Sequence, residues 1–541
     1  MAKQVVLVSG QISSGKTTLC TSLVERFGFV SFRTRDWIEE SVSDAKSERR
    51  AMQDYGDFLD RRTRGAWIRD ALTRSLTKLP ESANVVIDAV RIPEQIERLR
   101  EAYGPRVFHI HLEAPLTVLT KRFKQRDRPG FQESSTYSDV MRNETEANVV
   151  KLREIADIVI DTNRCTTDDV VVRAAAHLGL YDREYLRLVD VVIGGQYGSE
   201  GKGHIASYLA REYDVLVRVG GPNAGHKVFE EPSPYTFHHL PSGTRCTEAR
   251  LIIGPGAVVN IEGLLNEIND CQIDVRRLSI DPQVMVIEKR DVRNEERTLE
   301  MDIGSTAQGV GYATSRRIIG RGRKRGGNVV RLAKDIKILR PFLSESYEQF
   351  ERAFAQGKKI LLEGTQGTGL SLYHGRYPHV TSRDTTVSGC LAEAGISPGR
   401  IRKIVMVCRT YPIRVGNAPT TGQTSGFMSQ PTSKAEIARR ASIPVRELYQ
   451  RERGSTTHRP RRVAEFDWAL LRKAAALNSP TDLALTFTDY VDIRNREARR
   501  FEQLTDDTIR FVEEIERVVD ASVSLISTRF HSRSIIDRRR W

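Results

Sequence analysis

The sequence predicts an α/β protein with two domains, because the order strand, glycine-rich loop and helix occurs twice. Residues 4–10, QVVLVSG, form a β-branched run that ends in glycine, and a loop and a helical segment follow. The same order recurs at 188–213, LVDVVIGGQYGSEGKGHIASYLAREY. Each such opening is typical of a sheet covered by helices, and 541 residues exceed one ordinary core.

The join between the domains is expected near 175–188, where one helical pattern ends and a new buried strand begins. We therefore predict a first domain at 1–180 and a second at 187–541. No run of 18 or more apolar residues occurs, which indicates that no segment spans a membrane. The six cysteines form no CxxC pair, which favours the reducing cytoplasm as location over zinc sites or disulfides.

The formal net charge of +14 is carried mostly by arginine. It fits either nucleic-acid binding or pockets for small anions, together with solvated helix faces. No zinc-finger spacing or aromatic RNA-binding motif accompanies the charge. We therefore expect small phosphates and carboxylates as ligands and no nucleic-acid partner.

The first loop, GQISSGKT at 10–17, matches the phosphate-binding pattern G-x-x-x-x-G-K-[ST]. Gly10 and Gly15 let the backbone turn around a phosphate with its N–H groups pointing inward. Lys16 then reaches the β- and γ-phosphates, and Thr17 can ligate Mg²⁺. A strand before the loop and a helix after it supply the context that this motif needs.

The rest of the first domain is typical of phosphoryl transfer. A buried strand ends in Asp88 and is followed by Arg91, and a later helical segment carries Arg122 and Arg126. Such arginines can stabilise the charge on a transferring γ-phosphoryl group, although a solvated helix face would also explain them. No NKxD guanine motif is present, so a kinase fits better than a GTPase. Asp36 is a candidate for binding the acceptor.

These features resemble the nucleoside monophosphate kinases and the dephospho-CoA-kinase-like group over about 1–178. The resemblance rests on the phosphate loop, the segment DAVRIPE at 88–94 and the R-x3-R arginines, and the phosphate loop is the most specific of these. It implies a kinase-like domain with a parallel sheet. The acceptor of the phosphoryl group is left open.

The second domain carries a series of motifs in a fixed order. They are GGQYGSEGKGH at 194–204, VRVGGPNAGHKV at 217–228, LLEGTQGTGLSLYHGRYPHVTSRDTT at 361–386, TTHRPRRVAEFDW at 456–468 and LALTFTDYVD at 483–492. Together these motifs resemble the adenylosuccinate synthetase family across about 188–535. In that family a nucleoside triphosphate phosphorylates the 6-oxygen of IMP, and the amine of aspartate then displaces the phosphate.

The resemblance implies a large mixed sheet flanked by helices and related to P-loop GTPases. It also implies a homodimer that uses Mg²⁺, with nucleotides and L-aspartate as its small-molecule partners. The lysine of the loop, Lys202, and the general acid, His226, are the implied catalytic residues. The carbonyl of Gly225 is implied to bind Mg²⁺.

Further positions carry over residue by residue. The triphosphate-binding set is Gly198, Gly201, Lys202 and Gly203. The implied purine monophosphate site consists of Asn223, Thr306, Gln366, Thr381 and Arg459, with Arg321 as the arginine that reaches into the neighbouring subunit. The aspartate-binding loop contains Thr456, Thr457, Arg459 and Arg461.

The loop departs from the family wording W-G-D-E-G-K-G, whose aspartate withdraws the purine N1 proton and ligates Mg²⁺. Here Tyr197 replaces the tryptophan and Ser199 replaces the aspartate. A neutral serine is a poor base near pH 7, but it opens room beside purine C2 and can accept a hydrogen bond from a 2-amino group. Ser199 therefore favours GMP or dGMP, as in the diaminopurine-type branch of the family found in phages. Glu200 or a metal-bound water is a hypothetical substitute base.

A second departure concerns the donor nucleotide. The family reads the guanine of GTP with T-K-x-D, but here Phe487 stands in the lysine position, and Asp489 is retained. The later S-T-G-P becomes STRF, beginning at Ser527. ATP or dATP is therefore expected as donor, and GTP stays possible. A third departure is His458, which stands for a glycine of the aspartate loop.

Three interpretations remain open at this stage. The first is a ligase for GMP or dGMP fused to a nucleotide kinase. The second is an ordinary adenylosuccinate synthetase that acts on IMP with GTP. The third is a nucleotide-sensing protein without turnover, which Ser199 favours and the retained Lys202 and His226 oppose.

Overall fold

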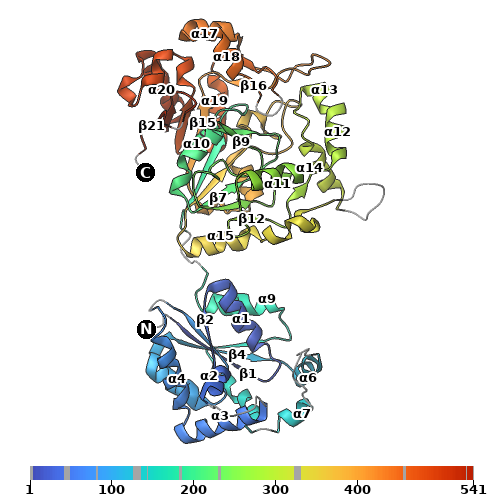
Figure 1. The fold of residues 1–541 in the computed structure, drawn as a ribbon, viewed down its shortest axis with the longest axis vertical. Coiled ribbons are helices and arrows are strands. Elements are labelled where there is room, and N and C mark those ends of the chain that lie inside the picture. The colour runs from blue at the N-terminus through green and yellow to red at the C-terminus, as the bar shows by residue number, and fades with distance from the viewer. Residues whose placement is uncertain are drawn as a thin grey trace. The chain divides into compact units, whose positions relative to one another are not determined.

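The computed structural model of the chain describes residues 4–41, 49–80, 83–125, 136–142, 144–181, 186–229, 233–321, 330–454, 458–531 and 533–539. The chain divides into two compact units, Met1–Arg183 and Glu184–Trp541 (Figure 1). The predicted ranges 1–180 and 187–541 each lie within one unit.

The N-terminal unit contains a five-stranded parallel sheet of order β2-β3-β1-β4-β5. Its strands are β1 (Val5–Gly10), β2 (Val30–Arg33), β3 (Val85–Asp88), β4 (Val107–Glu113) and β5 (Ile158–Asp161). Its helices are α1 (Lys16–Phe27), α2 (Thr34–Ser41), α3 (Arg49–Thr63), α4 (Ala66–Leu76), α5 (Pro93–Tyr103), α6 (Leu116–Lys124), α7 (Tyr137–Val140), α8 (Glu144–Asn148) and α9 (Thr167–His177).

The alternation of side chains along β1 explains why helices cover both faces of this sheet. Val5 and Leu7 belong to a core that also contains α4 and α5. Val6 and Val8 point to the opposite face and pack in a second core with α1 and α9. The central strand β1 is therefore buried on both sides, and the loop that follows it opens at the carboxyl edge of the sheet.

The C-terminal unit is built on a nine-stranded sheet of order β12-β10-β7-β14-β6-β15-β19-β20-β21. Its strands are β6 (Val189–Gly194), β7 (Val215–Arg218), β10 (Arg250–Ile253), β12 (Leu278–Ile280), β14 (Ile360–Glu363), β15 (Ile401–Arg409), β19 (Asp482–Thr486), β20 (Ser522–Ser527) and β21 (Ile535–Asp537). All pairs are parallel except β20 with β21. The predicted fold class, a parallel-sheet domain followed by a larger mixed-sheet domain, is confirmed.

Helices cover both faces of the large sheet. One core joins it to α15 (Ser346–Ala355), α16 (Val387–Ala394), α19 (Trp468–Asn478) and α20 (Asp506–Val519). The other joins it to α10 (Lys202–Leu209) and α11 (Ile261–Asp270).

Smaller elements complete the unit. The short strands are β8 (His226–Val228), β9 (Tyr235–Phe237), β11 (Val258–Val259), β13 (Met285–Val286), β16 (Ile413–Arg414), β17 (Pro431–Thr432) and β18 (Arg462–Ala464). The remaining α-helices are α12 (Lys289–Arg297), α13 (Leu299–Ile303), α14 (Val310–Ile319), α17 (Lys434–Ala441) and α18 (Val445–Arg451).

Within the described residues, no helix combines the length and apolar character that crossing a membrane requires. Cys20, Cys390 and Cys408 are buried, the other three cysteines are half-buried, and none of the six forms a disulfide.

Two buried histidines lie beneath the phosphate loop of the N-terminal unit. Ser9 Oγ is 2.7 Å from His109 Nε2 and 2.8 Å from His111 Nδ1. Burial lowers the pKa of both histidines to about 4. Both rings are therefore neutral near pH 7.

We expect the N-terminal unit to lose stability as the pH falls from about 6.5 to 4. The pKa of each histidine is lower in the folded than in the unfolded state, so the unfolded chain takes up more protons across this window. Between pH 7 and 5 the loss is up to about 2 kcal/mol per histidine. Calorimetric unfolding at pH 7 and at pH 5 measures this loss of stability.

The variant His111→Gln shows which unfolding transition belongs to the N-terminal unit. The stability of this unit should depend less on pH in the variant than in the wild type. The exposed His177 provides a matched control, because His177→Gln should leave the dependence unchanged. Equal pH dependence in all three proteins would contradict the prediction.

Candidate functional site

The candidate site lies where β6 of the C-terminal unit ends. The loop after Gly194 leads to α10, which begins at Lys202. Gly198 and Gly201 have φ angles of 86° and 94°, in the left-handed region that suits glycine. The loop therefore curls back to the N-terminus of α10, a geometry that binds phosphate.

Inside this loop the carboxylate of Glu200 is fully buried. Its Oε1 accepts from the backbone N–H groups of Gln196, at 3.1 Å, and Gly198, at 2.8 Å, and its Oε2 lies 2.7 Å from Lys202 Nζ. A Cβ atom on Gly367 would lie 2.3 Å from Oε1, so the neighbouring segment leaves no space around it. Glu200 thus shapes the loop and holds the lysine, which argues against the hypothesis that it acts as the base.

Ser199 lies next to this buried carboxylate but has an exposed side chain. Its backbone is left-handed, with a φ of 55°, and Arg409 Nη1 lies 3.4 Å from its carbonyl oxygen. The main chain at 199 is therefore held by its neighbours, while the side chain is available to a ligand. Such a position can change identity without disturbing the loop.

His226, Arg218 and Glu363 meet beside the loop. Arg218 and Glu363 are directly paired in the register of β7 and β14, at the last residue of each strand. His226 Nδ1 contacts Glu363 Oε1, and Arg218 Nη1 lies 3.1 Å from Nδ1. Ser242 N donates to Glu363 Oε2 at 2.7 Å. A Cβ atom on Gly203 would lie 2.7 Å from the Cβ of His226, so the histidine packs directly against α10.

The charges of Arg218 and Glu363 and the burial of the site determine the protonation state of His226. Burial, with a contribution from the charge of Arg218, lowers the pKa of His226 to about 4. Burial opposes ionisation of Glu363, but Arg218 and His226 outweigh it and hold the pKa of Glu363 at about 2. An ionised Glu363 thus accepts from Nδ1–H of a neutral imidazole. Such a pair fixes the tautomer and directs proton transfer to Nε2.

Three residues predicted to bind the purine monophosphate form one cluster. Gln366 Nε2 donates to Asn223 Oδ1 at 2.9 Å, and Asn223 Nδ2 lies 3.5 Å from Thr381 Oγ1. The backbone of Gln366 is left-handed, with a φ of 55°. A Cβ atom on Gly198 would lie 3.4 Å from the Cα of Gln366, so the cluster adjoins the phosphate loop.

Arg459 and Thr306, two more residues predicted to bind the purine monophosphate, lie close together. Arg459 Nη2 donates to the carbonyl of Ser305, the residue before Thr306, at 2.8 Å. Arg321 lies exposed just beyond α14, where its Nε donates to the carbonyl of Ile318 at 2.8 Å. Its role across a subunit boundary stays a prediction.

The segment expected to bind the base of the donor nucleotide, residues 486–489, contains a buried carboxylate between two arginines. We call it the donor-base segment. Asp489 is fully buried, and its Oδ2 accepts from Arg451 Nη1 and Arg496 Nε, both at 3.1 Å. Burial raises the pKa of Asp489 against the effect of these two arginines. The guanidinium of Arg409 lies 4.0 Å from the centre of the Phe487 ring, which therefore packs against protein in the position where the family has lysine.

Two hydroxyl groups fix the same segment. Thr486 Oγ1 donates to the carbonyl of Glu200 at 2.5 Å, which joins the segment to the phosphate loop. Ser527 is buried, and its Oγ donates to the carbonyl of Arg529 at 3.1 Å.

The structure describes only part of the predicted aspartate-binding loop. Thr456 and Thr457 lie outside the described residues. Arg461 Nη1 is 3.6 Å from Glu452 Oε2, and Arg409 Nη2 donates to Glu452 Oε1 at 2.6 Å. The buried Glu452 thus connects the aspartate loop to the arginine that contacts both Ser199 and the donor-base segment.

The N-terminal unit presents a separate phosphate loop. Lys16 Nζ donates to the carbonyls of Gly10, at 2.6 Å, and Gln11, at 2.9 Å. Thr17 Oγ1 donates to Asp88 Oδ2 at 3.0 Å. The lysine and the hydroxyl therefore lie together at the end of β1, as the motif predicts.

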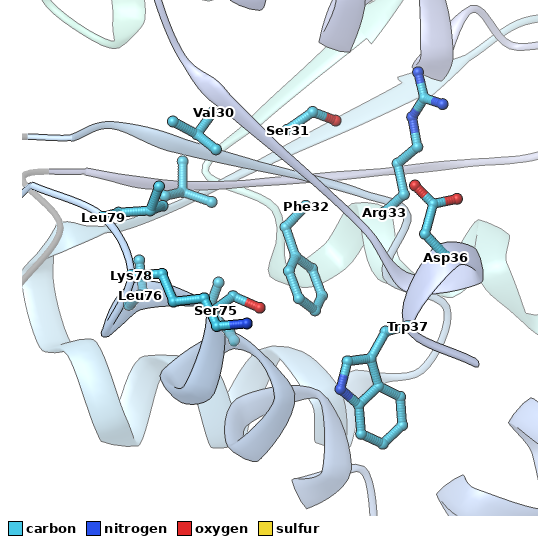
Figure 2. A pocket seen from close by; sticks show the side chains of 12 residues that line it. Val30, Ser31, Phe32, Arg33, Asp36, Trp37, Ser75, Leu76, Lys78 and Leu79 are labelled. Atoms are coloured by element: carbon cyan, nitrogen blue, oxygen red, sulfur yellow. The ribbon is translucent and has the colours of Figure 1, made fainter. Parts of the chain in front are cut away.

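The other candidates of this unit are more scattered. Asp36 is exposed in the first turn of α2 and lines a cavity along the edge strand β2 (Figure 2), and Arg91 follows β3. Arg122 donates to Thr162 Oγ1 and to the Thr162 carbonyl, both at 2.9 Å, so it is bound to the loop after β5. Arg126 lies outside the described residues.

Both loops offer oxygen donors that fit Mg²⁺. Thr17 is beside the carboxylate of Asp88, and the second unit offers the exposed Ser199 hydroxyl and the Gly225 carbonyl. Mg²⁺ commonly takes one or two protein oxygens together with substrate phosphates. Such an ion would neutralise phosphate charge during transfer.

The sequence interpretation missed four residues of the site: Arg218, Glu363, Arg409 and Glu452. Arg218, Glu363 and Arg409 are the last residues of β7, β14 and β15, which are far apart in the chain but belong to one sheet, so their contacts were not visible along the chain. The one available signal was the position of Glu363 inside the motif at 361–386, between an apolar pair and the GTQGT segment.

By fold and loop geometry the C-terminal unit is a nucleotide-using enzyme of the P-loop type. Residues 191–332 and 326–496 match the family described as adenylosuccinate synthetase, and residues 6–151 match an AAA domain. The chain therefore belongs to the adenylosuccinate synthetase family. It is a carbon–nitrogen ligase of this type that carries a kinase-like P-loop domain at its N-terminal side.

Related proteins agree with this assignment. The adenylosuccinate synthetases of Thermococcus onnurineus and Methanocaldococcus jannaschii are each 36% identical over 356 residues, which is 64% of this chain and 98% and 96% of theirs. The structure of cyanophage S-2L succinoaminodeoxyadenylate synthetase, bound to dGMP and to dATP as an energy donor, matches 65% of this chain and 96% of that one, with 26% identity and a TM-score of 0.53. Plasmodium falciparum adenylosuccinate synthetase shares the fold, at 20% identity and a TM-score of 0.54 over 65% of this chain and 100% of that one.

We expect Glu363→Gln to lower kcat of the ligase about 10²- to 10⁴-fold, because the amide cannot stabilise a protonated His226 as the carboxylate does. KM for the purine monophosphate should change little. Steady-state rates together with a thermal melt measure the effect on a folded protein.

Ser242→Ala serves as the control for this variant, because it removes the hydrogen bond that Ser242 Oγ donates to Glu363 Oε1 at 2.5 Å but keeps the backbone N–H donor and the charge of Glu363. It should cost less than about 10-fold in kcat. A Glu363→Gln enzyme that retained half of the wild-type kcat would refute the positioning role.

Proposed function

We propose that the C-terminal unit joins L-aspartate to C6 of a purine monophosphate that carries a 2-amino group, dGMP or GMP. The observation that carries this proposal is the exposed Ser199 in a loop whose shape is held by the buried Glu200. An aspartate at 199 would oppose a 2-amino group by its bulk beside C2. A serine leaves room there and accepts a hydrogen bond from that group, and sites that pair such a group discriminate strongly.

The chemistry follows from the residues that surround the loop. Lys202 and the loop N–H groups hold the triphosphate. The purine O6 attacks its γ-phosphorus, the bond to the β-phosphate oxygen breaks, the nucleoside diphosphate leaves, and the N1 proton passes to water. The amine of aspartate then attacks C6, and the phosphate leaves with the former O6. His226, oriented by Glu363, acts on the transferring phosphoryl group through Nε2. Bound phosphates raise its pKa again, so protonation accompanies binding.

The donor is ATP or dATP. Guanine would need both oxygens of Asp489 for its adjacent N–H groups, but Oδ2 already accepts from Arg451 and Arg496. Phe487 removes the lysine that packs on guanine in the family. The cyanophage structure, bound to dATP as an energy donor, supports the same preference.

The N-terminal unit transfers the γ-phosphoryl group of a nucleoside triphosphate to a nucleotide. Lys16, Thr17 and Asp88 supply the phosphate and Mg²⁺ contacts for this reaction. Two nucleotide-using activities in one chain then act on related substrates.

The ligase works as a homodimer, with Arg321 reaching the site of a second copy. Ile318 and Ile319, close to Arg321 at the end of α14, are 56% and 65% exposed, which suits coverage by another subunit. Sedimentation should give twice the mass of one chain, and a monomer would overturn this part of the proposal.

One assay tests the ligase proposal. The purified chain receives dGMP, GMP or IMP with L-aspartate, Mg²⁺ and ATP, dATP or GTP, and the aspartate adduct is measured. Adduct from dGMP or GMP supports the proposal. Adduct from IMP alone would show an ordinary adenylosuccinate synthetase, as the archaeal relatives are named, and no adduct would favour a nucleotide-sensing protein.

We expect Ser199→Asp to shift the ratio of kcat/KM for dGMP over IMP toward IMP by about 10-fold or more. The carboxylate narrows the space beside C2 and restores a base near N1. Ser199→Ala separates the two effects of serine, since it keeps the room but removes the acceptor. The alanine variant should raise KM for dGMP and leave IMP unaffected, and an unchanged dGMP preference in Ser199→Asp would refute the role of residue 199.

A further inference from the structure

A chain of hydrogen bonds lies behind the residues predicted to bind the purine monophosphate. Arg383 Nη1 donates to Thr365 Oγ1, and this hydroxyl donates to Gln366 Oε1 at 2.8 Å. The Nε2 atom of Gln366 then donates to Asn223 Oδ1 at 2.9 Å. Thr365, Arg383 and Gln366 are buried, whereas Asn223 is half-buried. The chain thus runs from the interior of the C-terminal unit to a residue that a ligand can reach.

The inner end of this chain is fixed by an ion pair and by close packing. Arg383 Nε donates to Glu393 Oε1 at 2.6 Å, and Arg383 Nη2 lies 3.7 Å from Cys390 Sγ. A Cβ atom on Gly220 would lie 2.2 Å from Thr365 Oγ1 and 2.8 Å from Arg383 Nη1. The backbone at Gly220 therefore closes over the contact between the guanidinium and the hydroxyl and holds the two groups together.

The chemistry of arginine determines the direction of the chain. A guanidinium donates hydrogen bonds and accepts none, so Thr365 Oγ1 accepts from Arg383 and has one hydrogen left to donate. Within the described part of the chain, the hydroxyl of Thr365 has Arg383 and Gln366 as its hydrogen-bond partners. If the amide of Gln366 were reversed, that hydrogen would be buried without an acceptor, which costs free energy. Gln366 therefore accepts through Oε1 and donates through Nε2.

The direction decides which atoms the chain presents at its outer end. Because Asn223 Oδ1 accepts from Gln366, the Nδ2 group of Asn223 lies toward the ligand side, 3.5 Å from Thr381 Oγ1. Gln366 Nε2 keeps a second hydrogen besides the one that it donates. Both amides thus offer N–H groups and use their oxygens internally. Such donors suit a phosphate, whose ionised oxygens accept strong hydrogen bonds.

We propose that Arg383, acting through Thr365, is a positioning residue for the phosphate of the bound purine monophosphate. It holds the amides of Asn223 and Gln366 with their N–H groups toward that phosphate. This inference rests on the proposed monophosphate site but not on which purine base occupies it. The chain acts on the phosphate, whereas Ser199 is proposed to act on the base, so the two contributions can be measured separately.

The variant Thr365→Val keeps the shape of the side chain but removes the hydroxyl that sets the direction. We expect KM for the purine monophosphate to rise about 10-fold or more, with kcat and KM for L-aspartate changed less than about 2-fold. Steady-state rates of the full chain measure both. Thr365→Ala, which also removes the hydroxyl and places fewer atoms beside Gly220, should raise this KM in the same way.

The rise should be equal for dGMP, GMP and IMP, because all three carry the same phosphate. Titration calorimetry of each monophosphate gives the same comparison as a change in Kd without turnover, so failure of the proposed ligase substrate is distinguished from failure of this inference. A rise for one base alone would show that the chain acts on the base, and it would overturn the proposal.

Three further proteins separate positioning from a general loss of structure. Thr365→Ser keeps the hydroxyl and should return KM to within about 3-fold of the wild type. Thr508→Val, at a buried threonine of α20 whose hydroxyl accepts from Asn495 Nδ2 at 2.8 Å, should leave KM for the monophosphate unchanged. In an Asn223→Ala background, Thr365→Val should raise KM by less than about 3-fold, because the amide through which it acts is absent.

Thermal melts show that each variant is folded. An unchanged KM in both Thr365→Val and Thr365→Ala, no rescue by Thr365→Ser, or an equal rise with and without Asn223 overturns the positioning role.

Discussion

The ligase site depends on the buried carboxylate of Glu200. It has no exposed surface, and it binds two N–H groups of its own loop and the ammonium group of Lys202. Removing one partner of such a buried pair leaves an uncompensated charge, which typically costs about 3–5 kcal/mol. The turn of the loop at Gly198 and the placement of the lysine that begins α10 are both held by this one group.

This arrangement explains how residue 199 can vary. Because Glu200 carries the structural role, the adjacent side chain contributes nothing to the internal hydrogen bonds of the loop described above. In the proposed function, the exposed serine is the side chain that distinguishes one purine from another. Under the proposed function, structural and substrate-selecting roles are divided between neighbouring residues of one phosphate loop.

A second buried carboxylate, Glu452, connects parts of the site that are far apart in the chain. It accepts from Arg409, which also lies over Phe487 and near the carbonyl of Ser199. Arg461 of the aspartate loop lies on its other side. The segments that the family resemblance assigns to the donor base, the purine and the aspartate therefore share one ionic cluster, and buried networks of this kind hold their members in a defined geometry.

The sequence by itself determined the two strand–loop–helix openings, the α/β class and the family, because phosphate loops and buried strands leave local patterns. It also placed Lys202, His226 and Ser199 in one site through their motifs. Only the tertiary structure decided that Glu200 faces inward, that Glu363 and Arg218 hold His226, and that Asp489 is bound by two arginines. Arg218 and Glu363 end strands that become neighbours only through sheet order, the segment at Gly367 closes over Glu200, and Arg451 lies 38 residues from Asp489. Periodicity along the chain carries no information about these arrangements.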